Sequence, residues 1–463
     1  MSVGNILFTG PMILAILEGL VLSLAVAATA FAWGHRLFVD WIDVATMLGQ
    51  AGAVSLCCIT AFYYNDLYDL RVVRSFSLFA SRLLQSFGVA LMLLGLFYTI
   101  VPDAGMTEGA FVSGLLVAAG LLVPLRAIGY TIMRRRAFAD RVLVLGTGPL
   151  ARRVIQEIES RPNFRYAVVG VVDDGTGVDA GDLPYPVLGP LERLDKILDD
   201  VKPDRLIVAL TERRGRMPLT QLLECGARGI LVEDGLRTYE YFTGKLPIES
   251  LTPSFLIFSG AFRKSRLQMG LRRASSLLLA AVGLLLSAPL MAVIAVAIAI
   301  DSRGPVFFVD RRAGRGGRPF NLVKFRTMHP LPPGEMVASS VWDRDDELRV
   351  TRVGRFIRKL RLDELPQFWN VVKGDMDLVG PRPEILANVQ TMSEEIPYYG
   401  LRHSVRPGLT GWAQTRFGYS VSLEQVTEKI RYDLFYIKQM SFWLDLRILV
   451  DTVKIMLFGR GAK

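Results

Sequence analysis

Two adjacent carboxylates, Asp363 and Glu364, lie within a stretch otherwise rich in arginine, 353–370, which reads VGRFIRKLRLDELPQFWN. The apolar residues of its first half recur at helical spacing, and Pro366 suits the first position of a second helix, which Gly374 would cap. The carboxylates therefore fall at a junction between two predicted helices. Placed there among basic side chains, they could stay ionised, bind a divalent cation and attack a phosphorus centre. Ordinary capping and ion pairing would explain the same spacing, and spacing alone favours that simpler interpretation.

A glycine turn, GTGPLA, runs from Gly146 through Gly148 to Ala151. It follows a predicted strand and precedes a predicted helix, as in the G-x-G-x-x-G/A turn that brings the backbone close to a pyrophosphate. Asp173 and Asp174 end the next predicted strand, where a ribose-binding acid would lie. Because many doubly wound folds carry this turn without catalysing a reaction, we favour a structural or regulatory nucleotide-binding-like domain over dinucleotide-dependent catalysis.

A third pattern, Tyr241 with Lys245, matches the Tyr-x-x-x-Lys pair of sugar-nucleotide dehydrogenases and epimerases. That pair works when both side chains project from one face of a long helix. Gly244 lies inside the pattern and Pro247 follows it, so a stable helix is not expected and we interpret the match as coincidence.

The composition indicates a membrane protein whose soluble parts face a reducing compartment. Hydrophobic residues make up 51% of the chain, the mean hydropathy is +0.34 and the formal net charge is +10. The positive charge fits the cytoplasmic surplus of an inner-membrane protein, attraction to lipid or substrate phosphates, or both. Three cysteines and three histidines are too few and too scattered for a disulfide framework or a zinc or histidine-ligated metal centre.

Four apolar stretches in the first third are each long enough to cross roughly 30 Å of hydrocarbon as a helix. They lie near 11–33, 42–64, 78–101 and 111–133. The link after the second stretch carries three arginines, the link after the third carries no lysine or arginine, and three arginines follow the fourth. The positive-inside rule therefore places the amino terminus and everything after residue 134 in the cytoplasm.

Strands and helices alternate from about residue 140 to about residue 260, which predicts a parallel, Rossmann-like sheet. The stretch 262–273 mixes basic and apolar residues and suits a helix lying at a membrane surface. The apolar run 274–300 could cross the bilayer outright, but basic residues flank both of its ends, and a crossing would place one set outside. Since Pro289 can kink a helix and Ser287 can satisfy a freed carbonyl, we predict a helix that enters and leaves on the cytoplasmic face.

Three motifs in the last 200 or so residues resemble those of a known family and occur in the same order as in that family. They read RAGRGGRPFNLVKFRTM, RKLRLDELPQFWNVVKGDMDLVGPRPE and RHSVRPGLTGWAQ. The stretch from about residue 263 to the end resembles the catalytic domain of monotopic phosphoglycosyl transferases, the bacterial sugar transferases that initiate exopolysaccharide, O-antigen and related glycans. The amino-terminal helices and the Rossmann-like middle resemble the additions of the large subclass of this family, and a re-entrant helix broken at a Ser/Pro site is a family feature too.

The resemblance implies roles for individual residues. Asp363 matches the family's nucleophile, which attacks the β-phosphorus of a UDP-sugar, releases UMP and holds the sugar phosphate until polyprenyl phosphate displaces it. Glu364 would complete the dyad as a general base or as an outer partner of the metal, and Mg2+ is expected on Asp363. The basic positions suited to phosphate are Lys324, Arg326, Arg358, Arg382 and Arg406.

We therefore predict a membrane protein of mixed α and α/β class. Its expected parts are a four-helix transmembrane bundle over 1–137, a Rossmann-like parallel α/β domain over 138–260, and a mostly α catalytic domain with a re-entrant membrane helix over 261–463. The expected reaction is transfer of a sugar 1-phosphate from a UDP-sugar to polyprenyl (undecaprenyl) phosphate at the bacterial inner membrane, with both soluble domains on the cytoplasmic face.

The expected partners are the UDP-sugar, polyprenyl phosphate and membrane lipid, with no nucleic acid, and the subclass resemblance suggests a homodimer. Two other functions stay open at this point. One is a nicotinamide-dependent sugar-nucleotide epimerase or dehydratase that works through the turn at Gly146 and Gly148. The other is a non-catalytic scaffold for polysaccharide assembly.

Overall fold

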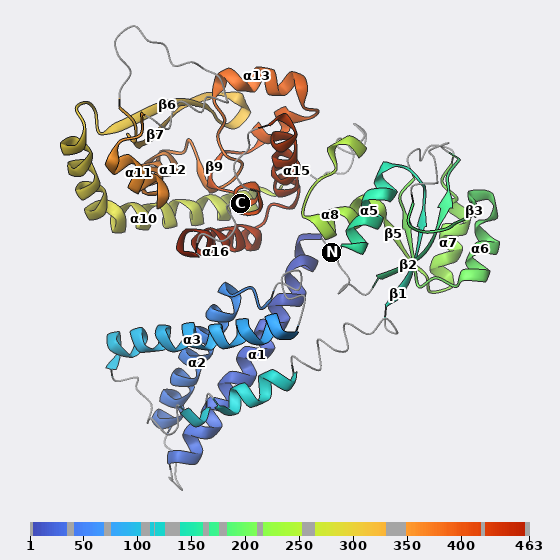
Figure 1. Ribbon diagram of the computed structural model, residues 1–463, viewed down its shortest axis with the longest axis horizontal. Coiled ribbons are helices and arrows are strands. Elements are labelled where there is room, and N and C mark those ends of the chain that lie inside the picture. Colours follow the sequence, from blue (N-terminus) through green and yellow to red (C-terminus); the bar gives the residue numbers. More distant parts are fainter. Residues whose placement is uncertain are drawn as a thin grey trace. The chain divides into compact units, whose positions relative to one another are not determined.

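The computed structural model describes most of the chain, in twelve ranges. These are residues 3–34, 41–68, 76–102, 112–114, 116–125, 139–160, 166–175, 183–210, 216–251, 264–329, 349–417 and 422–458. The chain divides into two compact units, Met1–Phe242 and Thr243–Lys463. Each unit is described below by itself (Figure 1).

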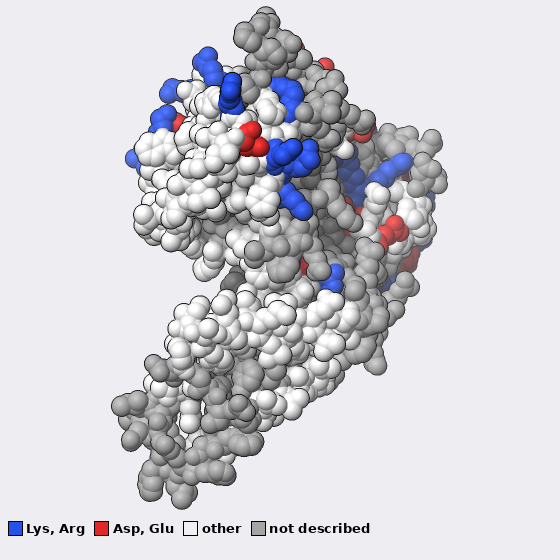
Figure 2. All heavy atoms as spheres, turned by 60° about the vertical axis from the view of Figure 1, so that its left-hand side comes forward, with Lys and Arg blue, Asp and Glu red and all other residues white. Residues whose placement is uncertain are grey.

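Long apolar helices open the first unit: α1 (Val3–Gly34), α2 (Trp41–Tyr64) and α3 (Phe76–Ile100). Buried side chains such as Leu22, Phe62 and Leu94 form one cluster between them, whereas Leu84 and Met92 point outward and are about three-quarters exposed, at 76% and 77%. Figure 2 shows a nearly uncharged described surface over this part of the molecule. Such helices are apolar on the outside as well as the inside, which is the pattern expected of helices that face lipid.

The fourth predicted stretch, 111–133, is described only in part. Residues 112–114 and 116–125 are helical, and Ala118 and Leu122 are buried in the same cluster as α1–α3. The rest of the stretch lies outside the described residues. Within the described part of the chain, three helical segments are long and apolar enough to cross a membrane: Ala45–Tyr64, Phe79–Ile100 and Arg266–Asp301.

A parallel five-stranded sheet in the order β3-β2-β1-β4-β5 completes the first unit. Its strands are β1 (Asp140–Leu145), β2 (Tyr166–Asp173), β3 (Val187–Pro190), β4 (Arg205–Val208) and β5 (Leu231–Asp234). The helices are α5 (Pro149–Glu159), α6 (Leu194–Val201), α7 (Leu219–Ala227) and α8 (Gly235–Thr243), with the short turn η4 (Leu191–Arg193) before α6. Figure 1 shows α6 and α7 on one side of the sheet and α5 on the other. The predicted Rossmann-like alternation is therefore confirmed.

The second unit is mostly helical. Its helices are α10 (Arg266–Asp301), α11 (Arg352–Lys359), α12 (Gln367–Lys373), α13 (Leu386–Glu395), α14 (Trp412–Arg416), α15 (Leu423–Gln439) and α16 (Phe442–Phe458). Its strands are β6 (Phe307–Ala313) and β7 (Pro319–Phe325), an antiparallel hairpin, and the short parallel pair β8 (Asp377–Val379) and β9 (Gly408–Thr410). Single turns are η5 (Ile248–Ser250), η6 (Arg315–Gly317), η8 (Leu362–Glu364) and η9 (Tyr399–Ser404).

Helix α10 is the longest element of the second unit, with 36 residues, and would span about 54 Å if it were straight. Instead, its ribbon changes direction in Figure 1, and Pro289 lies in its interior, where a proline removes a hydrogen bond and kinks a helix. Both ends pack on the same unit: Arg273 pairs with Asp377 at 2.8 Å, and the Asp301 carboxylate accepts a hydrogen bond of 3.0 Å from the Val353 amide. The helix therefore leaves and rejoins one compact body.

The start of α10 differs from the separate surface helix expected over 262–273. From Arg266 onward these residues are the first turns of α10 itself, capped by Ser265, while 262 and 263 lie outside the described residues. Arg272 is not a free flanking charge: it is only 7% exposed and pairs with Asp445 on α16 at 2.6 Å. A buried arginine of this kind joins two helices, and periodicity alone cannot reveal its partner.

The residues that follow α8 pack on α14 and α15. The Trp412 indole donates a hydrogen bond of 2.8 Å to the Gly244 carbonyl, and Lys245 forms an ion pair with Glu428. Helix α8 ends at Thr243, so Tyr241 and Lys245 do not share a helix face, as expected. Residues 243–251 thus belong with the second unit rather than with the sheet.

Helix α11 makes a close contact that only glycine permits. A Cβ atom on Gly354 would lie 2.1 Å from the carbonyl oxygen of Thr327. We expect Gly354→Ala to displace α11, to lower the thermal midpoint of the purified protein and to reduce enzymatic turnover.

A matched control is Gly270→Ala in the exposed first turns of α10, where a Cβ would meet nothing within 4 Å. Because alanine favours a helix interior over glycine by roughly 0.5–1 kcal/mol, this variant should keep or slightly raise the midpoint. Scanning calorimetry or dye-based melting of both variants measures the difference, and equal midpoints would contradict the packing argument.

Candidate active site

The turn that carries the carboxylates forms as the sequence predicts. Helix α11 begins after Thr351, whose side chain accepts a hydrogen bond from the Gly354 amide, and the chain then reverses at Arg361 in the left-handed region, with φ of 55°. Asp363 lies in the following turn η8, and Gly374 caps α12 with φ of 101°. Two short helices therefore meet at a half-buried carboxylate, as the spacing of apolar residues and proline indicated.

Charges of both signs surround Asp363. Burial raises the pKa of the Asp363 carboxyl, and the neighbouring Glu364 raises it further, whereas Lys324 and Arg358 act in the opposite direction. Burial also disfavours the charged form of Lys324 and so lowers the pKa of its ammonium group, and the nearby Arg312 lowers this pKa further. The structure thus brings Asp363 together with two of the predicted basic residues, one from β7 and one from α11. A carboxylate and cations in a partly dehydrated turn interact more strongly than they would in water.

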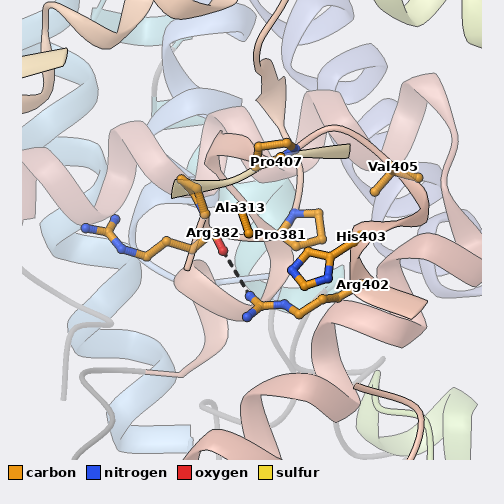
Figure 3. A pocket seen from close by; sticks show the side chains of 9 residues that line it. Ala313, Pro381, Arg382, Arg402, His403, Val405 and Pro407 are labelled. Carbon is orange, nitrogen blue, oxygen red and sulfur yellow. Dashed lines mark hydrogen bonds between the residues drawn. The ribbon is translucent and has the colours of Figure 1, made fainter. Parts of the chain in front are cut away.

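A third predicted cation reaches the dyad from a different segment. Arg382, in the Pro-Arg-Pro loop after β8, pairs with Glu364 at 3.0 Å. Figure 3 shows its side chain directed away from the other labelled residues of the loop, and this is the side chain that bonds Glu364. The pair leaves Asp363 as the member of the dyad that is not bound to Arg382.

Two predicted phosphate ligands are placed elsewhere. Arg326 is 6% exposed, and its terminal nitrogens donate to the carbonyls of Ser302 and Arg303 at 2.8 and 3.0 Å, beyond the end of α10. This geometry favours a structural role for Arg326 rather than contact with substrate. Arg406 lies 3.9 Å from Asp377, which already pairs with Arg273.

The hairpin β6–β7 supplies residues that were not singled out from the sequence. Asp310 and Arg312 form an ion pair of 2.6 Å on β6, and both contribute to the electrostatic environment of Lys324. Arg312 opens the motif RAGRGGRPFNLVKFRTM, and Asp310 lies two residues before it. What the sequence does not show is that strand pairing brings β6 beside Lys324. Figure 2 shows basic side chains gathered on the C-terminal unit.

A small hollow of about 10 Å³ lies beside the Pro-Arg-Pro loop, lined among others by Ala313, His403 and Pro407 (Figure 3). It is smaller than the usual pockets for small-molecule ligands, which are about 300–1,000 Å³. The side chain of Arg382 points away from it. We therefore locate the chemistry at Asp363 rather than in this hollow.

The chemistry of the dyad fits a magnesium ion shared with substrate. Among the described residues, no group of three or more His, Cys, Asp and Glu side chains could hold a metal by itself. Mg2+, however, is commonly bound through one or two carboxylates together with substrate phosphates and water. Asp363 with Glu364 meets that requirement, although Glu364 is also paired with Arg382.

The glycine turn of the first unit has a packing explanation. Gly146 has φ of +112°, and a Cβ there would lie 2.6 Å from the Ala209 carbonyl, so close strand packing requires glycine. Gly148 precedes α5 as its cap, and Ala151 is buried. Asp174, 5% exposed, accepts a hydrogen bond from Thr147 at 3.2 Å.

Asp173 is engaged in the same turn. Its carboxylate accepts from Thr147 at 3.4 Å and from the Gly175 amide at 3.0 Å. The acids at the end of β2 thus bond to neighbouring residues. Packing and local hydrogen bonds therefore account for the residue types of this turn, as in the structural interpretation favoured from the sequence.

Comparison with known proteins finds two family models that match parts of the chain. Residues 267–459 match the family model for bacterial sugar transferases, and residues 64–223 match a model described as a CoA-binding domain. An N-acetylgalactosaminephosphotransferase of Aeromonas hydrophila, which acts on UDP-N-acetylgalactosamine and undecaprenyl phosphate by its name, is 40% identical over 283 residues. These cover 61% of this chain and 63% of that protein, so the chain spans less than two thirds of its length.

Two longer matches are UDP-glucose:undecaprenyl-phosphate glucose-1-phosphate transferases. The protein of Escherichia coli K12 is 31% identical over 70% of each chain, and that of Klebsiella pneumoniae is 30% identical over 82% of each chain. The chain therefore belongs to the family of bacterial undecaprenyl-phosphate sugar phosphotransferases.

Proposed function

We propose that this enzyme transfers a sugar 1-phosphate from a UDP-sugar to undecaprenyl phosphate, with release of UMP, by way of a covalent intermediate on Asp363. The observation that carries the proposal is the half-buried Asp363 carboxylate in the electrostatic field of Lys324 and Arg358, beside a Glu364 that Arg382 holds. Cations from three separate segments converge on the two adjacent carboxylates, Lys324 and Arg358 on Asp363 and Arg382 on Glu364. A site of this kind is suited to binding a diphosphate and presenting a nucleophile to it.

In the first half-reaction, a carboxylate oxygen of Asp363 attacks the β-phosphorus of the UDP-sugar. The bond from that phosphorus to the bridging oxygen breaks, and UMP leaves with the electron pair. The sugar phosphate is then held as an acyl phosphate. The diphosphate and the Asp363 carboxylate are both negatively charged and would repel each other. Lys324 and Arg358 offset this repulsion.

In the second half-reaction, a phosphate oxygen of undecaprenyl phosphate attacks the same phosphorus. The bond to Asp363 breaks, and the carboxylate is regenerated. Glu364, which pairs with Arg382, would orient the acceptor or accept a proton from it. Bound Mg2+, held by Asp363 with Glu364, would supply further neutralisation of the phosphate oxygens.

The shape of α10 supports a re-entrant membrane helix in this function. Its outward residues are strongly exposed leucines and valines, such as Leu285, Leu286 and Val293 at 75%, 75% and 66%. Its two ends nevertheless bond to one compact unit that carries the charged dyad. Such a helix would dip into one leaflet and return, leaving Asp363 at the cytoplasmic interface where a lipid phosphate meets a soluble nucleotide sugar.

Removing the nucleophile tests the reaction directly. We expect Asp363→Asn to lower UMP release by roughly 10³-fold or more, because an amide cannot form the acyl phosphate. Purified protein is assayed with a panel of UDP-sugars, undecaprenyl phosphate and Mg2+. The control is Asp375→Asn, which alters a nearby carboxylate that pairs with Lys373 at 3.1 Å. Comparable activity in Asp363→Asn and in wild type would disprove the proposal.

Opposite charge changes around Asp363 should move the acid side of the pH profile in opposite directions. Lys324 favours the ionised carboxylate, so Lys324→Gln should raise the pKa of Asp363, and activity should be lost at a higher pH as the solution is acidified. Glu364 disfavours the ionised carboxylate, so Glu364→Gln should shift the same limb to lower pH. UMP release in the absence of acceptor, followed against pH, isolates the first half-reaction. Shifts in the same direction would argue against Asp363 as the titrating group.

The membrane topology of α10 can be tested by thiol labelling in intact cells. In a background without native cysteines, Arg266→Cys and Arg303→Cys mark the two ends of α10, and Val101→Cys marks the link after α3. A membrane-impermeant maleimide should label Val101→Cys directly but label the other two only after permeabilisation. Different accessibility of the two ends of α10 would show that the helix crosses the bilayer.

A further inference from the structure

The Pro-Arg-Pro loop is anchored through its carbonyl oxygens, in addition to the ion pairs of Arg382 with Glu364 at 3.0 Å and of Glu384 with Arg402 at 3.6 Å. Each carbonyl from Pro381 to Glu384 accepts a hydrogen bond. The donors, in chain order of the acceptors, are the Gly408 amide at 2.9 Å, the Arg402 guanidinium at 2.9 Å, the Arg312 guanidinium at 3.3 Å and the Ala313 amide at 2.9 Å. Two of the four residues are prolines and lack an N–H donor, so carbonyls carry most of the loop's anchoring.

Arg402 bonds the backbone of Arg382, the residue of this loop that pairs with Glu364. Its guanidinium donates to the carbonyl of Arg382 while the side chain of Arg382 extends in another direction, as Figure 3 shows, to Glu364 at 3.0 Å. Arg402 is 3% exposed, and its fork also bonds Asp433 at 2.9 Å and the Tyr399 hydroxyl at 3.0 Å. One planar cation thus joins α15, η9 and the loop.

The charge of Arg402 is compensated in place. Burial acts to lower the pKa of the Arg402 guanidinium, but Asp433 and the other polar groups around it raise the pKa above its usual value. Asp433 is itself 1% exposed. A buried ion pair of this kind costs desolvation and is weak evidence for added stability, so its geometry points to a role in fixing one conformation.

We infer that the Arg402–Asp433 pair is a positioning device for the reaction: it fixes the backbone of Arg382 so that the Arg382 guanidinium holds Glu364 beside Asp363. This inference rests on the proposed function. Neither residue of the pair touches the dyad directly, so both act through Arg382. A lysine at 402 would keep the charge but could not bond the carbonyl, the carboxylate and the hydroxyl together in the geometry of a planar fork.

A double-mutant cycle tests this inference on the full-length protein. We expect Arg402→Lys to lower kcat/KM for UMP release by about ten- to a hundredfold. In an Arg382→Ala background, Arg402→Lys should lower kcat/KM by less than about twofold, because the guanidinium that Arg402 positions is already absent. A full additional loss in the double variant would overturn the inference.

Arg272→Lys is the matched control, since Arg272 is also buried and paired with an aspartate, at 7% exposure, but belongs to the contact of α10 with α16. Arg272→Lys should lower kcat/KM by the same factor in the wild-type and in the Arg382→Ala background, as expected for general destabilisation. Masking of the Arg272→Lys effect to the same degree would mean that the cycle reports stability rather than positioning, and would also overturn the inference. Should Arg402→Lys fail to fold, Asp433→Asn enters the same cycle with the same expected masking.

The outcomes separate this inference from the proposed function. Should Arg382→Ala or Asp363→Asn leave UMP release unchanged, the proposed function fails. If those two variants are impaired and the cycle is additive, only the positioning role fails.

Discussion

A carboxylate that is half-buried beside another carboxylate is unstable as an anion unless positive charge is held close to it. Asp363 and Glu364 are in this situation, and much of the second unit can be understood as the means of holding those cations in place. Lys324 arrives on a β-hairpin, Arg358 on the helix before the dyad, and Arg382 on a loop after it. The same positive field favours anionic groups in general, so the cations that stabilise the dyad also suit the diphosphate of the proposed donor.

The cations are held at defined positions because the segments that carry them are hydrogen-bonded to one another. Arg358 is oriented by Thr327, which accepts a hydrogen bond of 2.8 Å from its Nε atom. Asn370 of α12 bonds the backbone of β7 twice, accepting from the Val323 amide at 3.0 Å and donating to the Asn321 carbonyl at 2.7 Å. The strand that carries Lys324 is therefore fixed to the helix that follows the dyad. Because the side chains of Arg358 on α11 and Asn370 on α12 are hydrogen-bonded in this way, the turn η8 between the two helices has little conformational freedom.

The long helix α10 packs against both helices that flank Asp363. Gly283 leaves room for the ring of Phe368 on α12, whose atoms would lie about 3.0 Å from an added Cβ, and Ile298 packs with Ile357 of α11. The two halves of α10 thus contact the two helices on either side of Asp363. Exposed leucines and valines on the same helix are costly in water and favourable in hydrocarbon. One element consequently carries exposed apolar surface and also supports the turn that holds Asp363.

Local sequence determined the pieces of this protein. Apolar length determined α2 and α3, strand–helix alternation determined the parallel sheet, and the proline and glycine around 353–374 determined a two-helix junction with Asp363 in the turn. These features depend on neighbours within a few residues, where propensity and periodicity act. The tertiary structure decided which charges meet. It buried Arg326 against the backbone beyond α10, paired Arg272 with Asp445 across 173 positions, and joined Arg402 to Asp433 behind the Arg382 loop. An arginine looks the same in a sequence whether it faces water, phosphate or a buried carboxylate, because its role depends on the desolvation and the partner that only folding supplies.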